Sequence, residues 1–365
     1  MSGVDVLPPI STTALLTALD GGALFLLDVR DPDEVADWRI DGVHNIPVAD
    51  LAGRLDEVPH DGEVVVICAS GSRANQAASA LASAGIASRV LDGGMHAWAS
   101  TYDVVDGELG GATVTQVRRR GKGCLSYVVG AADRCVVIDP AKEVDRYEEL
   151  ARQRGWRITH VVDTHLHADH LSGARDLAAR TGANLWLNPS DPFEFEFEPL
   201  TDGSSVTLAD GVELTVEAVS VPGHTEGSTM YRLGESAVFT GDTVFLESVG
   251  RPDLADQAES FAHQLYRSLH ERVLPLGDDV TVFPAHYGAG VSVRSGRFVA
   301  APLGDLRRTL PALALSEDDF VAWALAHVTD RPPNYQRIVR INAGREPFAP
   351  DASELEVGPN RCAIA

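Results

Sequence analysis

The stretch Thr164-His165-Leu166-His167-Ala168-Asp169-His170 decides how the larger part of this chain folds. It follows the apolar segment 160–163, which is typical of a β-strand. Three histidines and one aspartate, all between positions 165 and 170, supply the nitrogen and oxygen donors that transition metals prefer. A single histidine is usually a packing residue, but a cluster with this spacing predicts a metal site at the end of a strand.

Three other segments repeat this arrangement, each with a metal-ligand residue type just past an expected strand. They are Pro222-Gly223-His224-Thr225, Thr240-Gly241-Asp242-Thr243 and Pro284-Ala285-His286-Tyr287. Because strand ends converge on one edge of a sheet sandwich, we expect these side chains to meet the first cluster in space. The spacing alone permits one metal ion or two.

The sequence around these segments predicts two packed sheets covered by helices. Apolar runs bounded by turn residues indicate strands at 125–129, 135–138, 212–221, 229–233 and 237–240. Helices are expected at 172–180, 261–273 and 317–327, and Arg331-Pro332-Pro333 ends the last of them.

The first hundred residues have a different pattern, in which strands and helices alternate. Strands are expected at 23–29, 63–68 and 88–91, with a helix start at residues 31–34 and an alanine-rich helix up to Leu81. This alternation predicts an α/β domain with a parallel sheet. A polar, glycine-bearing stretch follows at 99–114. We therefore expect a first domain at 1–103, a linker at 104–112 and a second domain at 113–365.

Cys68 lies where one expected strand ends and the alanine-rich helix begins. A thiol at a helix N-terminus faces free backbone N–H groups, which stabilise a thiolate. The small residues Ala69, Ser70, Gly71 and Ser72 let the backbone curl around the sulfur, and Arg73 adds positive charge. An isolated strand-end cysteine is usually a packing residue, but this loop favours a reactive one.

This loop resembles that of the rhodanese (sulfurtransferase) domain, and the resemblance extends over residues 8–103. It rests on LLDVRDPDEVADWRIDGVHNIPVADL at 26–51, CASGSR at 68–73 and LDGGMHAW at 91–98. It implies that Cys68 carries a persulfide sulfur held by the backbone amides of residues 69–73, with Arg73 as a second catalytic residue. The six-residue loop fits a sulfur atom, whereas the related phosphatases use seven residues around a phosphate.

The histidine and aspartate segments resemble the metallo-β-lactamase superfold, an αββα sandwich, over about residues 112–300. The motif set is complete and includes Asp139. Within this superfold, the persulfide dioxygenases are the most similar. That similarity rests on HADH at 167–170, the Pro-Gly-His-Thr-x-Gly pattern around His224, Gly-Arg-Pro-Asp at 250–253, PPNYQRI at 332–338 and the tail 358–363.

This resemblance implies one Fe(II) ion per chain, held by His165, His224 and Asp242. Such a two-histidine, one-carboxylate set leaves positions for O₂ and a persulfide sulfur. The remaining ligand-type residues would surround this site or form a remnant second metal site: His167, Asp169, His170 and His286.

Three residues are candidates for the substrate side of the site: Arg251, Asp253 and Tyr287. The alternative for Arg251 and Asp253 is a purely structural ion pair. We expect Cys124 and Cys135 to be packing residues, and Cys362 to lie near a flexible end.

Together the resemblances predict an enzyme of sulfane-sulfur metabolism. A low-molecular-weight thiol persulfide, such as glutathione persulfide, would be oxidised by O₂ to sulfite and free thiol. Cys68 would exchange sulfur with the carrier thiol and with thiosulfate or sulfite. The first alternative is a glyoxalase II-type thioester hydrolase with zinc or two metals. That family has an aromatic residue in place of Ala168 and Cys-Gly-His in place of residues 284–286. The second is a sulfur carrier or sensor without turnover.

Composition excludes several other classes. The chain has 365 residues and a net charge of -23, which disfavours nucleic-acid and membrane partners because phosphate groups would be repelled. No apolar run approaches the roughly 18 residues that span a bilayer. The start of the chain does not have the pattern of a signal peptide, and the four separated cysteines fit a reducing compartment. We therefore expect a cytoplasmic protein, and a homo-oligomer.

Overall fold

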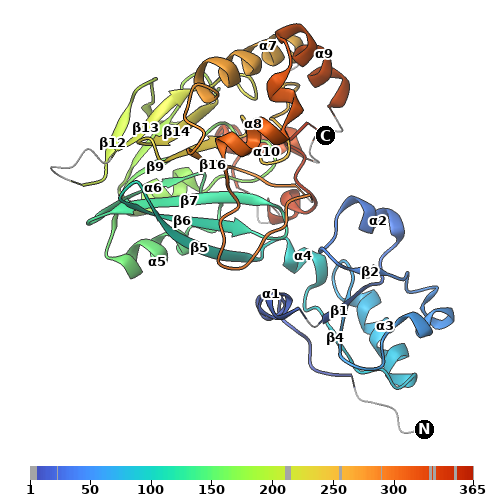
Figure 1. Cartoon of the computed structure of the whole chain (residues 1–365). Helices are drawn as coiled ribbons and strands as arrows, with labels where there is room; N and C mark the ends of the chain where they lie inside the picture. The colour runs from blue at the N-terminus through green and yellow to red at the C-terminus, as the bar shows by residue number, and fades with distance from the viewer. Residues whose placement is uncertain are drawn as a thin grey trace. The chain divides into compact units, whose positions relative to one another are not determined.

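The structure, a computed structural model, describes residues 6–22, 24–209, 215–254, 257–288, 290–328, 331, 334–348 and 352–364. The chain forms two compact units (Figure 1). The first unit comprises residues up to 103 together with 119–122 and 357–359. The second comprises 104–118, 123–356 and 360–365.

The first unit contains a four-stranded sheet in the order β2-β1-β3-β4, and all neighbouring strands are parallel. Its elements are α1 (Thr12–Gly21), β1 (Leu24–Asp28), α2 (Pro32–Asp37), β2 (His44–Asn45), β3 (Glu63–Ile67), α3 (Ser72–Ser83), β4 (Ser88–Val90) and α4 (Gly94–Trp98). Alternate residues of β3 face opposite sides: Val64 and Val66 pack with α3, whereas Val65 and Ile67 pack with α1 and α4. Both faces of the sheet are thus covered, as expected for a parallel sheet.

Local sequence explains two helix starts in this unit. Asp31 and Glu34 form a capping box at the start of α2, with Pro32 in the first turn. In α3, Ala74, Ala77, Ala78 and Leu81 recur at helical spacing and are buried. This small-residue face lets α3 pack closely on β3.

The second unit is a sandwich of two sheets. The first sheet has the order β11-β10-β9-β8-β7-β6-β5. Its strands are β5 (Tyr102–Leu109), β6 (Ala112–Arg119), β7 (Cys124–Ala131), β8 (Arg134–Ile138), β9 (Arg157–Val162), β10 (Asn184–Leu187) and β11 (Glu198–Pro199). Helices α5 (Asp145–Arg154) and α6 (Ala174–Thr181) pack against β9.

The second sheet has the order β12-β13-β14-β15-β16-β17. Its strands are β12 (Ser205–Thr207), β13 (Thr215–Ser220), β14 (Thr229–Leu233), β15 (Ala237–Gly241), β16 (Thr281–Pro284) and β17 (Ala301–Pro302). Helices α7 (Ala258–Ser268), α8 (Leu303–Thr309) and α9 (Glu317–His327) share a buried apolar cluster with this sheet. A last helix, α10 (Tyr335–Asn342), precedes the 3-10 turn Ala352–Glu356.

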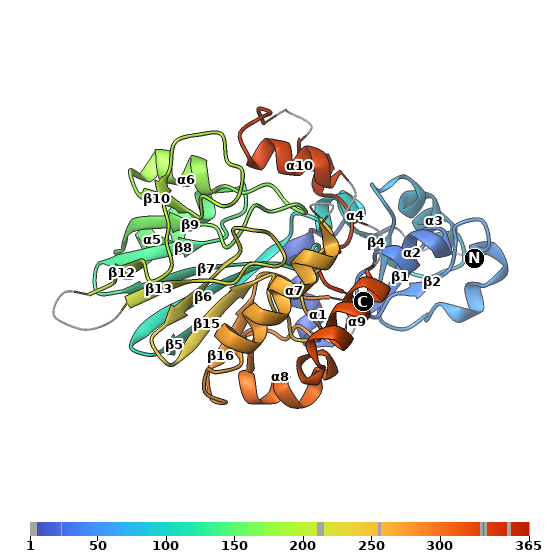
Figure 2. The same cartoon turned by 90° about the horizontal axis from the view of Figure 1, so that it is seen from above.

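The main core of this unit lies between the two sheets. Tyr127 of β7 packs against Phe239 of β15 and Phe283 of β16, with ring centroids 4.8 and 5.5 Å apart. In Figure 2, α5 and α6 lie on one side of the two sheets, and α7, α8 and α9 lie on the other. The predicted αββα sandwich is therefore confirmed.

Most predicted elements of both units are present, with shifts of a few residues at their ends. The predicted strand 212–221 corresponds to β13, and its residues 212–214 lie outside the described residues, as do Ala23, Pro332 and Pro333. The segment 104–112, predicted as a linker between the domains, forms most of β5 and the turn into β6. Gly110 and Gly111 both have positive φ, so these glycines make a hairpin turn. In the described part of the chain, no helix is long and apolar enough to cross a membrane.

Candidate metal centre and cysteine loop

The predicted metal-ligand residues all follow the ends of strands. His165, His167 and His170 come after β9, His224 after β13, Asp242 directly after β15, and His286 after β16. In each sheet a parallel pair brings two such ends together, β8 with β9 and β15 with β16. The two sheets therefore deliver the segments to one end of the sandwich.

Three of these residues, His165, His224 and Asp242, form a triad with converging donor atoms. Oδ2 of Asp242 lies 3.4 Å from Nε2 of His224 and 3.6 Å from Nε2 of His165. All three side chains are buried, and none of these three atoms has a hydrogen-bond partner. A buried polar atom without a hydrogen-bond partner lowers the stability of the fold by about 1–3 kcal/mol. Three such atoms facing one another therefore indicate a shared partner. A single metal cation fits that position.

The charge states of the triad suit a cation. Burial lowers the pKa of both His165 and His224, so both are neutral and offer a lone pair. Burial alone would raise the pKa of Asp242, but His286 and His165 hold it below its usual range. The triad therefore combines two neutral imidazoles with one carboxylate.

Neighbouring groups fix which nitrogen of each imidazole is free. Nδ1 of His224 lies 2.9 Å from the carbonyl oxygen of Arg251, which can only accept, so Nδ1 carries the proton. Nδ1 of His165 lies 2.9 Å from the hydroxyl of Thr164, which itself donates to Asp139. In both histidines Nε2 is therefore the unprotonated nitrogen, as a metal ligand requires.

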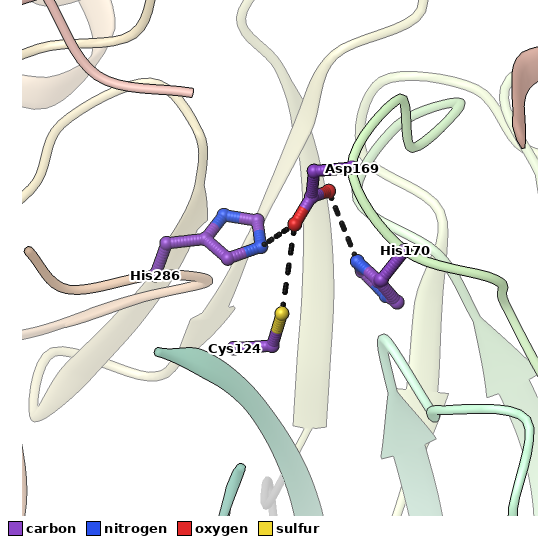
Figure 3. Close-up of side chains that lie close together, drawn as sticks. All are labelled: Cys124, Asp169, His170 and His286. Atoms are coloured by element: carbon purple, nitrogen blue, oxygen red, sulfur yellow. Dashed lines mark hydrogen bonds and ion pairs between the residues drawn. The ribbon is translucent and has the colours of Figure 1, made fainter. Parts of the chain in front are cut away.

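A second group surrounds the carboxylate of Asp169 (Figure 3). Oδ1 of Asp169 lies 3.0 Å from Nδ1 of His170, and Oδ2 lies 2.9 Å from Nε2 of His286. The latter pair is at ion-pair distance but outside hydrogen-bond geometry. Cys124 Sγ donates to Oδ2 at 3.5 Å. These four residues, which we call the Asp169 tetrad, could geometrically hold a second metal.

Protonation distinguishes the tetrad from the triad. Burial and His167 oppose protonation of His170, but Asp169 and Cys124 raise its pKa to about 9. Burial and Asp169 raise the pKa of Cys124, but His286 and His170 outweigh them and lower it to about 7. The tetrad thus holds a proton on His170 near neutral pH, where a metal would need a lone pair.

His167 belongs neither to the triad nor to the Asp169 tetrad. It forms a third group with Asp139 and Asp163. Its Nε2 lies 3.1 Å from Oδ1 of Asp139 and 3.8 Å from Oδ1 of Asp163. Asp139 has a φ of 51°, and its other oxygen accepts from Thr164. His167 and Asp139 therefore support the loop that carries His165.

The predicted substrate-side residues are placed differently from one another. Arg251 is fully buried and bonds Asp253 through Nε at 2.7 Å and Nη2 at 2.9 Å. Its Nη1 donates to the carbonyl of Arg361 at 3.0 Å. Tyr287 packs against the core between the sheets. Arg251 thus reaches the site through its backbone carbonyl on His224, and the role of all three residues toward substrate stays a prediction.

Sequence reasoning missed several residues of this site. Cys124, expected to be a packing residue, belongs to the tetrad. Cys362, expected near a flexible end, is buried beside Asp242 and His286. Burial and nearby Asp169 and Asp242 raise the pKa of the Cys362 thiol. Only Cys135 behaves as a packing residue, with a pKa raised to about 12 by burial.

Asp191 was also missed, although it links the two loops that carry the triad histidines. It is buried, and its carboxylate accepts from the backbone N–H of Leu166 at 2.8 Å and of Gly227 at 2.9 Å. It also accepts from the Thr225 hydroxyl at 3.1 Å. A loop aspartate in front of a run with three phenylalanines gives no sequence signal for this role.

A cavity of about 420 Å³ opens beside the triad. His224 forms part of its wall, together with Leu166 and Ala168, which flank the histidines of the first motif. Such a volume lies in the usual range, about 300–1,000 Å³, for small-molecule sites. The cavity therefore gives a substrate a place next to the candidate metal.

The cysteine loop lies in the first unit, between β3 and α3. Cys68 Sγ accepts hydrogen bonds from the backbone N–H of Gly71 at 3.1 Å and of Ala74 at 3.3 Å. Sequence reasoning expected the amides of residues 69–73, so Ala74 is an addition. Gly94, with φ of +56°, backs the loop, and a Cβ there would lie 2.3 Å from the Cys68 carbonyl oxygen. This explains the glycine at the first position of α4.

Arg73 does not point freely at the sulfur. Its Nη1 and Nη2 bond the two carboxylate oxygens of Glu34 at 2.6 and 2.8 Å. This bidentate pair lowers the pKa of Glu34 to about 2. Arg73 thus ties the start of α3 to α2, and its catalytic role stays a prediction.

Family models match both units. A model described as rhodanese-like domain matches residues 11–101, and one described as metallo-beta-lactamase superfamily matches residues 119–286. The chain joins a rhodanese-like domain to a metallo-β-lactamase domain. Both resemblances seen in the sequence are thereby confirmed.

Individual relatives match the metallo-β-lactamase domain. Human mitochondrial persulfide dioxygenase ETHE1 is 29% identical over 202 residues, which are 54% of this chain and 74% of the relative. Hydroxyacylglutathione hydrolase of Methylococcus capsulatus is 36% identical over 155 residues, 41% of this chain and 56% of the relative. The crystal structure of ETHE1 from Myxococcus xanthus has a TM-score of 0.56 at 27% identity, covering 64% of this chain and 99% of that one.

Proposed function

We propose that the metallo-β-lactamase domain oxidises a low-molecular-weight thiol persulfide with O₂, at one Fe(II) held by His165, His224 and Asp242. The observation that carries this is the contrast between two groups. The triad has three buried donor atoms without partners. In the Asp169 tetrad the carboxylate is already paired with His170 and His286, and His170 keeps a proton near neutral pH. We therefore expect one ion at the triad, and none at the tetrad while His170 is protonated.

The overall reaction is RSSH + O₂ + H₂O → RSH + SO₃²⁻ + 2H⁺. Iron, when bound, supplies the redox chemistry that joins triplet O₂ to closed-shell sulfur. The chain's own residues prepare the site. Arg251 and Thr164 hold the protons on Nδ1 of the two histidines, and His286 holds one oxygen of Asp242. Ala168 leaves room in the cavity wall for the sulfur end of the substrate.

Relatives support this reaction over others of the same fold. Persulfide dioxygenases match along three quarters of their length, with 29% identity for the human and 28% for the mouse protein. The match to the Myxococcus xanthus structure extends over almost that whole chain. The fold alone would leave the chemistry open.

For the rhodanese-like domain we propose that Cys68 carries a persulfide. It would accept sulfur from the carrier, Cys68-SH + RSSH → Cys68-SSH + RSH. It would pass that sulfur to sulfite, Cys68-SSH + SO₃²⁻ → Cys68-SH + S₂O₃²⁻. The amides of Gly71 and Ala74, which donate to the sulfur, support a bound anion there. One chain carrying both domains raises the effective concentration of sulfite and persulfide at either site. Thiosulfate would be a further sulfur donor or product at Cys68. We also propose that the protein is cytoplasmic and forms a homo-oligomer.

A second candidate is thioester hydrolysis of the hydroxyacylglutathione hydrolase type. The observation in its favour is that the four tetrad donor atoms lie within 4.8 Å of one another and could accept a second metal. The identity of 36% to the Methylococcus capsulatus hydrolase points the same way. Two metals activating a water would then replace iron and O₂.

O₂ uptake with defined metals separates the two candidates. The full chain is stripped of metal and reloaded with either Fe(II) or Zn(II), then given glutathione persulfide or S-lactoylglutathione. We expect O₂ uptake and sulfite only from the iron form with the persulfide. The matched control is His165→Gln, which removes one triad donor and should abolish uptake. Thioester hydrolysis by the zinc form, with no O₂ uptake by the iron form, would overturn the proposal.

A further inference from the structure

Asp191 lies in the loop between β10 and β11, and the backbone of this loop is fixed from two sides. The N–H of Asp191 donates to the carbonyl of Asn188 at 3.2 Å, and Nδ2 of Asn188 donates to the hydroxyl of Thr229 at 3.1 Å. Three residues further on, the N–H of Glu194 donates to the carbonyl of Ala343 at 2.7 Å, in the C-terminal extension beyond α9. The side chain of Asp191 is buried. Its carboxylate therefore has a fixed place.

This carboxylate joins the two loops that carry the triad histidines, and it does so through one oxygen atom. Oδ2 of Asp191 accepts from the backbone N–H of Leu166 at 2.8 Å and from the hydroxyl of Thr225 at 3.1 Å. Leu166 directly follows His165, and Thr225 directly follows His224. Each bond thus lies one residue away from a triad ligand, so a shift of this oxygen changes the spacing of the two histidines.

The described hydrogen bonds of the Asp191 carboxylate all come from neutral donors. Besides Leu166 and Thr225, the N–H of Gly227 donates to Oδ1 at 2.9 Å. Moving a carboxylate out of water is unfavourable unless hydrogen-bond donors surround it, and an apolar residue of similar size would fill the same space without that penalty. An acid at this position therefore indicates that holding these three donors has a purpose beyond packing.

Gly227, the last residue of the Pro-Gly-His-Thr-x-Gly pattern, leaves the space that the carboxylate occupies. A Cβ at this position would lie 2.5 Å from Cγ and 2.8 Å from Oδ2 of Asp191, and 2.9 Å from its backbone nitrogen. The φ of Gly227 is not positive, so its backbone conformation does not require glycine. This position is therefore a glycine because Asp191 packs against it.

From these contacts we propose that Asp191 is a positioning residue of the metal centre. Its Oδ2 sets the spacing between His165 and His224, and the glycine at 227 makes room for it. The inference rests on the proposed function, because it takes the triad as the place of the metal. It depends on neither the substrate nor the oxidant. Asp191 acts on the metal through the two loops and not as a ligand.

Binding of Co(II) to the metal-free full chain tests the inference without any turnover. The visible absorption of bound Co(II) depends on the geometry of its ligands, so one titration gives the affinity and a spectroscopic signature. We expect Asp191→Asn to weaken Co(II) binding about tenfold and to change the spectrum at saturation, because an amide offers one acceptor oxygen to three donors. The loss stays moderate, since the N–H of Thr229 still donates to the carbonyl of Thr164 at 2.7 Å and keeps the loops joined.

Gly227→Ala should weaken Co(II) binding by a similar factor, because the new Cβ displaces the carboxylate. Both substitutions disable the same contact, so the double variant should bind about tenfold more weakly than wild type, and not about a hundredfold. The control is Asp106→Asn, which removes another aspartate that accepts from a threonine hydroxyl, that of Thr115 at 2.6 Å, between β5 and β6. The control should change neither the affinity nor the spectrum.

Urea unfolding of the metal-free variants separates positioning from general stability. If Asp191→Asn lowered the free energy of unfolding but kept the wild-type Co(II) affinity and spectrum, Asp191 would only support the fold and the inference would be overturned. Losses that multiply in the double variant would overturn the role given to Gly227. If Asp191→Asn does not fold, Thr225→Val removes one bond to Oδ2 and should cause a smaller loss in the same direction. Because the titration uses neither O₂ nor a persulfide, its failure is distinct from failure of the proposed oxidation.

Discussion

Nδ1 of His286 lies 2.6 Å from Oδ1 of Asp242, and this contact determines which carboxylate oxygen is available to a metal. The other oxygen, Oδ2, faces Nε2 of His224 at 3.4 Å. The second nitrogen of His286 lies 2.9 Å from Asp169. Asp169, His286 and Asp242 thus form a line that presents a single oxygen of Asp242 to the triad.

Replacing His286 by glutamine should therefore weaken metal binding without removing a direct ligand. Groups that orient metal ligands typically contribute about 10–100-fold to metal affinity. Competition with a chelator measures the Fe(II) affinity of the full chain. The control is His263→Gln, a partly exposed histidine of α7 that bonds Glu317. Unchanged affinity in the His286 variant would show that Asp242 needs no such support.

The number of metals can be tested at His170. His170 lies outside the proposed iron site, so His170→Gln should still bind one metal per chain, whereas His165→Gln should bind none. Elemental analysis of both purified variants measures this directly. A wild-type chain with two metals that drops to one in the His170 variant would favour the dinuclear hydrolase.

Independence of the two domains can be tested at Cys68. Because Cys68 is the sulfur held by the amides of Gly71 and Ala74, Cys68→Ser should abolish sulfur transfer from thiosulfate to a thiol. O₂ uptake with glutathione persulfide should stay within about twofold of wild type, as expected for sites that do not share residues. Loss of both activities would refute separate sites.

The pair between Glu34 and Arg73 predicts a pH dependence of stability. Arg73 lowers the pKa of Glu34 from 4.5 to about 2. A lowered folded-state pKa means that the pair stabilises the fold above pH 4.5, and that this contribution is lost as pH falls toward 2. Glu34→Gln should lower the free energy of unfolding at pH 7 by at most about 1 kcal/mol, because the pair is partly exposed and screened.

Urea unfolding of the full chain at pH 7 and pH 3 measures that difference. The gap between wild type and Glu34→Gln should narrow at the lower pH. If the difference in free energy of unfolding between wild type and Glu34→Gln were the same at pH 7 and pH 3, folding would not lower the pKa of Glu34.

Much of the fold was predictable because local rules dominate it. Residues close together in the sequence determine two of its features, the capping box at Asp31 and Glu34 and the alanine face of α3. The same holds for the triad, since each ligand follows its own strand and strand ends meet at one edge of a sandwich. The hairpin at 104–112 was not predicted, because a polar strand at the edge of a sheet has the composition of a linker.

The rest of the site depends on contacts between distant residues, which no local pattern encodes. Asn342 reaches His167 and His170 across more than 170 positions. Cys362 lies beside Asp242 although it stands at the far end of the chain. Asp191 is a loop residue whose importance comes only from the two loops it bonds. The contacts of Asn342 and Cys362 follow from how the C-terminal extension packs on the sandwich, and those of Asp191 from how two loops of the sandwich meet.

The most direct test of the central claim is O₂ uptake on glutathione persulfide as Fe(II) is added stepwise to metal-free protein. If one iron in the His165, His224 and Asp242 triad carries the reaction, uptake rises in proportion to iron and stops rising at one ion per chain, with one sulfite formed per O₂. Uptake that needs two metal equivalents per chain, or none at any iron content, would contradict the account.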